Sequence, residues 1–198
     1  MSADDKVKPA RERILDAAAA VMREKGLTST TTKAIAAAAG YSEALLYKHF
    51  ADKQELFLCV LKERVPQVHL DSPGDGDLAG NLTGIVEQLM GFFVQTFPIA
   101  ASIFGSPELL AQHRQAITGR GYGPAAPVHR VQAYLDAERQ AGRIRAACDT
   151  TSAARLLVGA AFHQGFLAAF GGFRTVSNAH AIAAGIVATV LPALAVSP

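Results

Sequence analysis

The stretch TTKAIAAAAGYSEALLYKHF, residues 31–50, decides the fold that this sequence predicts. Its apolar positions indicate two very short helices, over Thr31–Ala38 and Ser42–His49, with Gly40 between them. Each helix begins at a Thr or Ser, whose side-chain oxygen can accept a hydrogen bond from an exposed backbone N–H. Two short helices joined by a glycine-containing turn have the dimensions of a helix-turn-helix, in which the second helix enters the major groove of DNA.

Helical spacing assigns an inner and an outer side to this pair of helices. The inner side, which we expect to pack against a core, comprises Ile35, Ala36, Ala39, Leu46 and Phe50. The outer side of the second helix comprises Glu43, Leu45, Tyr47 and Lys48. These outward residues are the first candidates for contact with DNA.

Two longer helices flank the pair. One is predicted over residues 9–25, with Gly26 as its stop signal. The other begins at the capping residue Asp52 and runs toward Pro66. The sequence therefore predicts an N-terminal DNA-binding domain over residues 1–65, built on a three-helix unit that contains the helix-turn-helix.

The rest of the chain, residues 66–198, is predicted to form a second, larger helical domain. The stretch Asp71–Asp77 is the clearest linker, because its glycines and proline oppose a helix. Apolar residues then recur at three- and four-residue steps from Leu78 to Phe97, which predicts a long helix that ends at Pro98. Further helices are expected near residues 107–118, 127–141, 150–170 and 176–194. No alternating strand pattern is present, so the predicted fold class is all-α.

The distribution of charge is uneven along the chain, although the net charge is only +2. All seven lysines precede residue 65, whereas residues 65–113 carry five acids and no Lys or Arg. A phosphate-facing surface is therefore expected in the N-terminal domain. Half of the residues are hydrophobic and 18% are charged, which predicts that apolar surface is buried in a ligand pocket or against a partner chain.

Several classes of protein are disfavoured by motifs that the sequence lacks. Cys59 and Cys148 have no CxxC partner, so both are predicted to be packed thiols, and neither a metal nor a cofactor is expected. The N-terminus has no apolar signal-peptide core, which predicts a cytoplasmic protein. The longest apolar stretch, Ala181–Val196, has 16 residues, fewer than the roughly 20 that a membrane span needs. Neither a GxSxG elbow nor an HExxH motif is present, so the chain is predicted not to be an enzyme.

The run RILDAAAAVMREKGLTSTTTKAIAAAAGYSEALLYKHFADKQEL, residues 13–56, resembles the N-terminal signature of the TetR family of transcriptional regulators. The matching features are the helix ending in Gly26, the Thr-rich start before Ile35-Ala36, the turn Ala39-Gly40-Tyr41-Ser42, the segment Leu46-Tyr47-x-x-Phe50, and Lys53 followed by Leu56. They cover about a quarter of the chain in one fixed register. The resemblance implies an N-terminal DNA-binding domain followed by a helical domain for ligand binding and dimerisation.

The resemblance also implies which residues contact double-stranded DNA. Phosphate contacts are expected from Thr31, Tyr47 and Lys53. Contacts in or beside the major groove are expected from Lys33, Ser42, Glu43, Ala44, Leu45, Lys48 and His49. Lysines release counterions when they neutralise phosphates, and a tyrosine hydroxyl can donate to a phosphate oxygen. Many family members carry Gly then Thr where this chain has Ala44 and Leu45, whose methyl groups are suited to thymine.

For the larger domain, the resemblance implies a pocket for a small-molecule effector. The candidate lining is Leu89, Met90, Phe93, Phe97, Phe104, His113, Tyr122, Phe162, His163 and Phe166. Aromatic and flexible apolar groups of this kind suit a hydrophobic ligand, and a well-filled core is the alternative. The candidate dimer interface, in which small residues permit close helix approach, is Leu156, Gly159, Ala160, Ile182, Gly185 and Ala188.

Together these features predict a homodimeric repressor that binds a palindromic operator and is released by its effector. Activation by the ligand is a second possibility, because coupling between two sites can have either sign. A helical scaffold protein, whose basic N-terminal face is only solvated, is a further alternative. It differs in predicting no salt-sensitive affinity for DNA.

Overall fold

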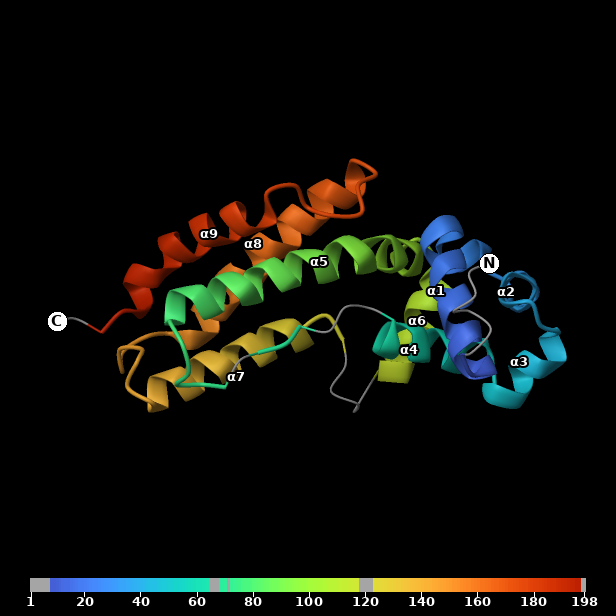
Figure 1. Ribbon diagram of the computed structural model, residues 1–198, viewed down its shortest axis with the longest axis horizontal. Helices are drawn as coiled ribbons and strands as arrows, with labels where there is room; N and C mark the ends of the chain where they lie inside the picture. Colours follow the sequence, from blue (N-terminus) through green and yellow to red (C-terminus); the bar gives the residue numbers. More distant parts are fainter. Residues whose placement is uncertain (1–7, 65–67, 71, 118–122, 197–198) are drawn as a thin grey trace. The chain divides into compact units, whose positions relative to one another are not determined.

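A computed structural model describes residues 8–64, 68–70, 72–117 and 123–196. In these residues every regular element is an α-helix, which confirms the all-α class (Figure 1). The helices are α1 (Ala10–Ser29), α2 (Thr32–Ala39), α3 (Glu43–His49), α4 (Lys53–Glu63), α5 (Leu78–Phe104), α6 (Pro107–Ile117), α7 (Ala126–Gln140), α8 (Thr150–Phe170) and α9 (Ala179–Leu194).

The helices divide into two compact units. The N-terminal unit contains α1–α4 together with Pro98–Leu110, and the C-terminal unit contains α5 up to Phe97 and the chain from Ala111 onward. The sequence placed a single boundary between residues 65 and 66, whereas the end of α5 and the start of α6 belong to the N-terminal unit. The physical reason is that Ile99 and Ile103 are buried in the same core as α1–α4.

The core of the N-terminal unit gathers the apolar sides of its helices. The inward residues predicted for the helix-turn-helix, Ile35, Ala36, Ala39, Leu46 and Phe50, are all buried in it. They lie against α1 and α4, whose buried residues include Ile14, Leu15, Met22, Leu56 and Val60. The helix-turn-helix is therefore fixed to the rest of its domain by hydrophobic burial on one side only.

Helix α5 continues through Pro98 to Phe104, so the prediction that it ends at Pro98 is wrong. A proline inside a helix has no N–H to donate to the carbonyl four residues earlier, which destabilises the helix. Burial of Ile99 and Ile103 offsets this loss, because both residues stay in the core only if the helix continues. Ser102 Oγ also donates to the carbonyl of Pro98 at 3.0 Å.

The C-terminal unit is a layer of helices that run side by side, with α5, α7, α8 and α9 sharing one core (Figure 1). Helices α5 and α8 approach most closely at Gly165, where a Cβ would lie 2.6 Å from Phe93 Cβ. Cys148 is buried in this unit and Cys59 is half-buried in the other, and both are free thiols, as predicted.

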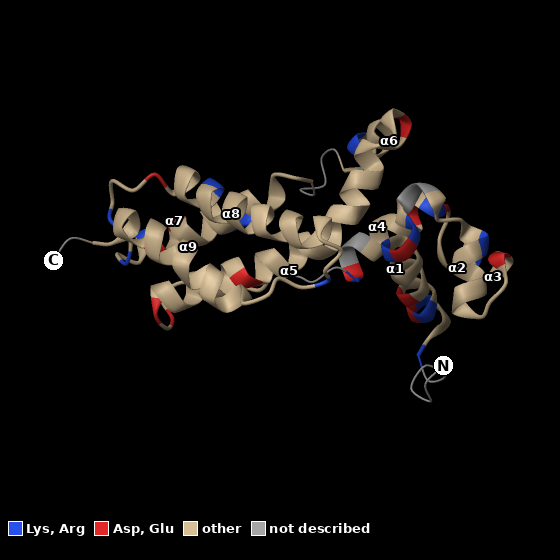
Figure 2. Ribbon diagram, turned by 90° about the horizontal axis from the view of Figure 1, so that it is seen from above, with Lys and Arg blue, Asp and Glu red and all other residues tan. Residues whose placement is uncertain are grey.

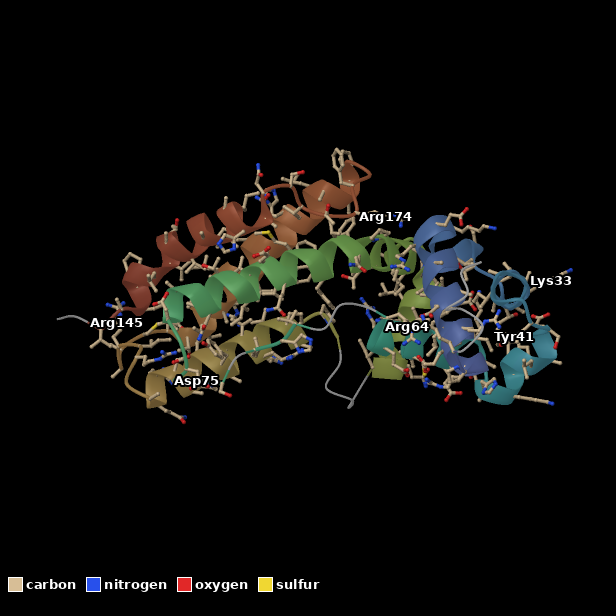
Figure 3. The ribbon with its side chains drawn as sticks, viewed as in Figure 1. Lys33, Tyr41, Arg64, Asp75, Arg145 and Arg174 are labelled. Carbon is tan, nitrogen blue, oxygen red and sulfur yellow. The ribbon has the colours of Figure 1, made fainter. Side chains whose placement is uncertain are left out.

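A buried ion pair holds the loop before α5 against α7. Glu138 is 0% exposed and accepts hydrogen bonds from Arg143 Nε and Nη2, both at 2.6 Å. Arg143 also donates to the carbonyl oxygens of Gly76 and Asp75, at 2.7 and 3.1 Å (Figure 3 labels Asp75). The hydrogen bonds from Arg143 lower the pKa of Glu138, and burial raises the pKa of the neighbouring Tyr134 to about 12.

Among the described residues, α8 is long and apolar enough to cross a membrane, with a mean hydropathy of 1.3 over 18 residues. The bent pair Leu78–Phe104 and Pro107–Gln115 passes the same test together. Core helices of globular proteins also pass it, and α8 buries Ala154, Leu157 and Ala161 within its own unit. The expectation that this chain does not enter a membrane remains a prediction.

Candidate nucleic-acid interface

The turn between α2 and α3 has the geometry of a glycine-terminated helix. Gly40 lies in the left-handed region, with φ 74° and ψ 32°, where a side chain would be strained. Its N–H donates to the carbonyl of Ala37 at 3.1 Å, and the N–H of Tyr41 donates to that of Ala36 at 2.9 Å. These bonds end α2 and redirect the chain into α3, as the glycine in the sequence predicts.

Arg13 fixes this turn to α1, a role that sequence reasoning missed. Its guanidinium donates to the Tyr41 hydroxyl at 3.0 Å and to the Ala39 carbonyl at 3.1 Å. The guanidinium carbon also lies 4.8 Å from the centre of the Tyr41 ring, close enough for a cation–π interaction. No local pattern marks this contact, because Arg13 and Tyr41 are separated by 28 positions in the sequence.

Helix α3 presents one side to solvent. Ser42 caps its start, accepting a hydrogen bond from the N–H of Leu45 at 3.3 Å, while Leu46 is buried. The outward face of α3, by which we mean Ala44, Tyr47, Lys48 and His49, is exposed. Tyr47 is 48% exposed, so its ring is available for contact with a partner. Leu45, which the sequence placed outward, is half-buried.

Several predicted phosphate contacts are exposed and chemically available. Lys33 projects from α2 (Figure 3), and Figure 2 shows basic positions on both α2 and α3. In the described part of the chain, neither Lys33 nor Lys48 has an ion-pair partner. Thr31 accepts a hydrogen bond from the N–H of Ala34 at 3.1 Å, which leaves its hydroxyl proton available for a phosphate. Lys53 differs, because its amine lies 5.1 Å from the Phe57 ring centre and burial lowers its pKa.

Other cations of the N-terminal unit are neutralised by acids of the same unit. Arg11 binds Glu63 through two hydrogen bonds, at 2.8 and 2.7 Å. Arg64 (labelled in Figure 3) contacts Glu12 and donates to Asp16 at 2.6 Å. These pairs connect the start of α1 with the end of α4. Lys33 on α2 and Lys48 on α3 are exposed and take part in none of these pairs.

Glu43 is exposed, as predicted, but its carboxylate already has a partner. Thr32 Oγ1, in the first turn of α2, donates to Glu43 Oε1. The Tyr47 hydroxyl in turn lies 3.5 Å from Thr32 Oγ1. Sequence reasoning did not assign a role to Thr32, since the contact depends on how α2 and α3 are packed together.

Part of the predicted effector lining comes together in the C-terminal unit. Phe162 lies edge-on to Phe93, with ring centres 5.2 Å apart, and Phe97 lies 5.0 Å from Phe166. Phe97 and Phe162 are 6.1 Å apart, so these four rings form one aromatic cluster between α5 and α8. Leu89 and Met90 are buried in the core of the same unit. This cluster also contacts Phe92 and Phe170.

The other members of the predicted lining are not in this cluster. Phe104 is 69% exposed and belongs to the N-terminal unit. His163 is exposed, and His113 is half-buried, with burial lowering its pKa. Tyr122 lies outside the described residues.

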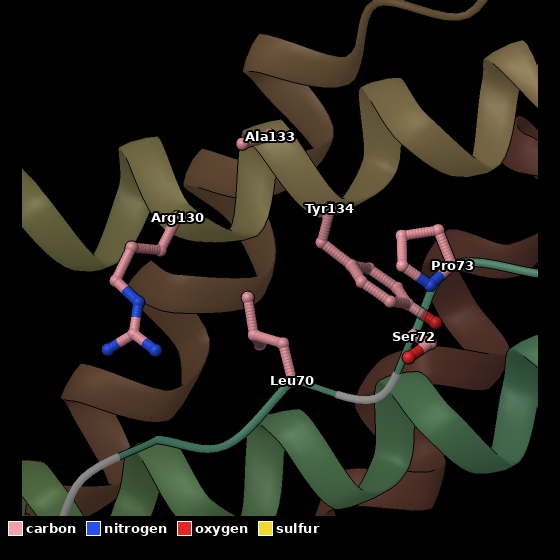
Figure 4. Close-up of a pocket in the computed structure, with 6 residues that line it drawn as sticks. All are labelled: Leu70, Ser72, Pro73, Arg130, Ala133 and Tyr134. Atoms are coloured by element: carbon pink, nitrogen blue, oxygen red, sulfur yellow. The ribbon is translucent and has the colours of Figure 1, made fainter.

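A groove of about 430 Å³ lies elsewhere on the C-terminal unit, between α7 and the segment before α5 (Figure 4). It is lined by Leu70, Ser72, Pro73, Arg130, Ala133 and Tyr134. None of these residues belongs to the predicted effector lining. The guanidinium of Arg130 donates to the Val68 carbonyl at 2.6 Å, and Tyr134 is itself buried.

The six predicted dimer residues lie on the outer side of α8 and α9. Leu156 is 63% exposed, and Gly159, Gly185 and Ala188 are exposed. Ala160 and Ile182 are half-buried. Helix α9 has no Asp, Glu, Lys or Arg, and appears entirely uncharged in Figure 2.

The fold and the exposed helix agree with comparisons to known proteins. The family described as bacterial regulatory proteins, tetR family, matches residues 14–60, which include the whole helix-turn-helix. Over these residues the chain matches the TetR family. This confirms the resemblance carried by residues 13–56.

Individual TetR-family relatives support this assignment. The HTH-type transcriptional repressor KstR2 of Mycobacterium tuberculosis is 32% identical over 87 residues, which are 44% of this chain and 42% of that protein. A crystal structure of a putative TetR-family regulator from Mesorhizobium loti is similar with a TM-score of 0.73 and 23% identity, covering 94% of this chain and 97% of that one.

A second solved structure, the regulator FadR of Bacillus subtilis in complex with stearoyl-CoA, has a TM-score of 0.67 and 16% identity, covering 92% of this chain and 98% of that one. The curated relatives are matched over less than half of their own length, so sequence similarity concentrates in the DNA-binding domain and the solved structures extend the likeness in fold. The names of KstR2 and FadR describe a transcriptional repressor and a transcriptional regulator.

Proposed function

We propose that this TetR-family protein is a cytoplasmic repressor that binds a palindromic operator as a homodimer and leaves it when a small hydrophobic effector binds. The observation that carries the proposal is the outward face of α3. A seven-residue helix exposes Tyr47 and Lys48 while its opposite side is buried. Contact with a DNA groove would explain why this aromatic ring and the unpaired lysine beside it both face solvent.

The polar groups around α3 suit the chemistry of a DNA backbone. Lys33 and Lys48 are exposed cations that can displace counterions from phosphates. Thr31 adds a hydroxyl donor, and the Tyr47 hydroxyl can exchange its long 3.5 Å contact with Thr32 for a phosphate oxygen. Such contacts position a protein on the duplex without reading its sequence. Ala44 offers a methyl group for contact with thymine.

A dimer follows from the small size of the reading helix. One short helix supplies fewer contacts than specific DNA binding normally requires. The exposed apolar side of α8 and α9, with Leu156, Gly159, Gly185 and Ala188, can form a four-helix interface with its copy in a second chain. A two-fold axis through that interface pairs two α3 helices with two half-sites, so the operator is palindromic.

The effector is proposed to bind at the aromatic cluster of α5 and α8. Phe93, Phe97, Phe162 and Phe166 offer ring edges and faces, and residues 65–113 carry no Lys or Arg that would select an anion. Phe97 and the buried Ile99 lie on one helix, so a change at the cluster can be transmitted along α5 to the N-terminal core. Release requires only that the effector favours a conformation that does not fit DNA.

The proposal is tested by fluorescence anisotropy with labelled duplex from the region upstream of the chain's own coding sequence. Tyr47→Ala and Lys48→Ala should weaken binding to all duplexes alike, and Lys48→Ala should reduce the slope of log affinity against log salt by about 1. Arg174→Ala removes an exposed cation of the C-terminal unit and serves as the charge-matched control. Equal affinities for Lys48→Ala and Arg174→Ala would contradict the role given to α3.

A further inference from the structure

The contact between Thr32 and Glu43 joins the two helices of the DNA-binding motif at the surface where DNA is expected. Thr32 is buried at the start of α2, and Glu43 is exposed in the first turn of α3. The Thr32 hydroxyl donates to Glu43 Oε1, and the Tyr47 hydroxyl is within 3.5 Å of Thr32 Oγ1. The three side chains therefore form a relay in which Tyr47 donates to Thr32 and Thr32 donates to Glu43.

We propose that Thr32 is a positioning residue for DNA recognition, and that it holds Glu43 as a fixed hydrogen-bond acceptor that selects cytosine in the major groove. The inference rests on the proposed function, because it assumes that α3 enters that groove. Thr32 occupies only one carboxylate oxygen. In the described part of the chain the other, Oε2, has no recorded partner and remains available to a base.

The choice of cytosine follows from the hydrogen-bonding groups on the base edges. An ionised carboxylate can only accept. Cytosine presents its N4 amino group as a donor, guanine presents the N7 and O6 acceptors, and thymine presents the O4 acceptor and a methyl group. Adenine has an amino donor, but its N7 acceptor lies beside it and repels a second carboxylate oxygen. Cytosine is therefore the best partner for Glu43.

The relay explains why a carboxylate is tolerated on a surface that must approach phosphates. A freely moving glutamate would repel the DNA backbone and would lose side-chain entropy when it met a base. The hydrogen bond from Thr32 restricts Glu43 before DNA arrives, so less entropy is lost on binding. It also directs the Tyr47 hydroxyl toward α2, which holds that ring on the outward face of α3.

The test begins with selection from a pool of duplexes with a randomised central segment, using the wild-type protein. Anisotropy is then measured on the selected duplex and on its single-base variants. Glu43→Gln should change the preference at one position of each half-site from cytosine toward adenine, because a glutamine amide pairs with adenine N6 and N7, and the ratio of the two affinities should shift about tenfold. Glu24→Gln, at an exposed acid of α1, changes the charge equally and should leave every base preference unaltered.

Thr32 is tested by Thr32→Val, which keeps the branched shape but removes the hydroxyl, and by Thr32→Ser, which restores it. Valine should reduce the cytosine preference severalfold and serine should recover it, a pattern that a purely structural role would not produce. Thermal melts verify folding, and Glu43→Gln carries the test alone if Thr32→Val does not fold. Base preferences that stay the same in Glu43→Gln while DNA is still bound would overturn this inference alone. Failure of the wild type to bind any duplex in a salt-dependent manner would overturn the proposed function and this inference with it.

Discussion

Replacing Gly165 by alanine tests the close approach of α5 and α8 in the C-terminal unit. The added Cβ would lie 2.6 Å from Phe93 Cβ, 3.0 Å from the Val94 nitrogen and 3.2 Å from the Phe93 carbonyl carbon. Carbon atoms normally approach to about 3.5–4.0 Å, so α5 and α8 must separate by about 1 Å. Two of the three obstructing atoms are backbone atoms, which cannot rotate away.

The expected loss of stability combines two opposing effects. Overpacking of a well-packed core costs about 1–3 kcal/mol. Alanine is favoured over glycine inside a helix by about 1 kcal/mol, which offsets part of that cost. The net destabilisation is therefore about 0–2 kcal/mol, and the melting temperature should fall by up to about 8 °C in a chain of this size.

Gly91→Ala is the matched control, since Gly91 lies inside α5 and a Cβ there would meet nothing within 4 Å. This variant gains the higher helix propensity of alanine without a steric clash between α5 and α8. Its melting temperature should therefore rise by about 1–4 °C. Circular dichroism melts at one protein concentration measure both variants. If Gly165→Ala is stabilised as much as Gly91→Ala, the close approach of α5 and α8 is refuted.

Two further predictions concern a buried charge and the proposed dimer. Arg143 lowers the pKa of Glu138, so the stability that this carboxylate contributes is complete at neutral pH and is lost as the pH falls below about 4.3. Glu138→Gln should therefore be less stable at pH 7 and show a smaller drop in urea midpoint between pH 7 and about pH 2.5, a range that extends below the ordinary pKa of a glutamate. An unchanged drop would argue against this ion pair. Leu156→Arg should convert a dimer to a monomer in light scattering, because it places a charge in an apolar interface, whereas Thr175→Arg, in the exposed loop before α9, should remain dimeric. A dimeric Leu156→Arg would place the interface elsewhere.

The DNA-binding unit was predicted well because its signals are local. Thr31 and Ser42 cap α2 and α3, and Gly40 takes the left-handed conformation between them, as the residue types indicate. The inward positions also follow from helical spacing alone, and all five are buried. Short-range backbone chemistry is encoded in neighbouring residues, so one sequence is enough to locate it.

The features that were missed depend on contacts between distant parts of the chain. Pro98 locally disfavours a helix, but α5 continues through it because Ile99 and Ile103 are buried. The hydrogen bond of Arg13 with Tyr41 joins α1 to the turn before α3, and that of Thr32 with Glu43 joins α2 to α3. No spacing rule indicates either contact. Only some of the residues predicted to line the effector pocket lie together in the structure, for the same reason. Periodicity predicts which side of a helix is apolar, but it does not predict which helices will face each other.

Methylation protection of an operator duplex tests the central claim most directly, because dimethyl sulfate modifies guanine N7 in the major groove, where α3 is proposed to lie. For a selected palindromic duplex, two symmetric protected patches are predicted on one face of the DNA, about one helical turn or a multiple of it apart. Lys48→Ala should weaken both patches equally. A single protected patch, or protection that persists when α3 is altered, would contradict the account.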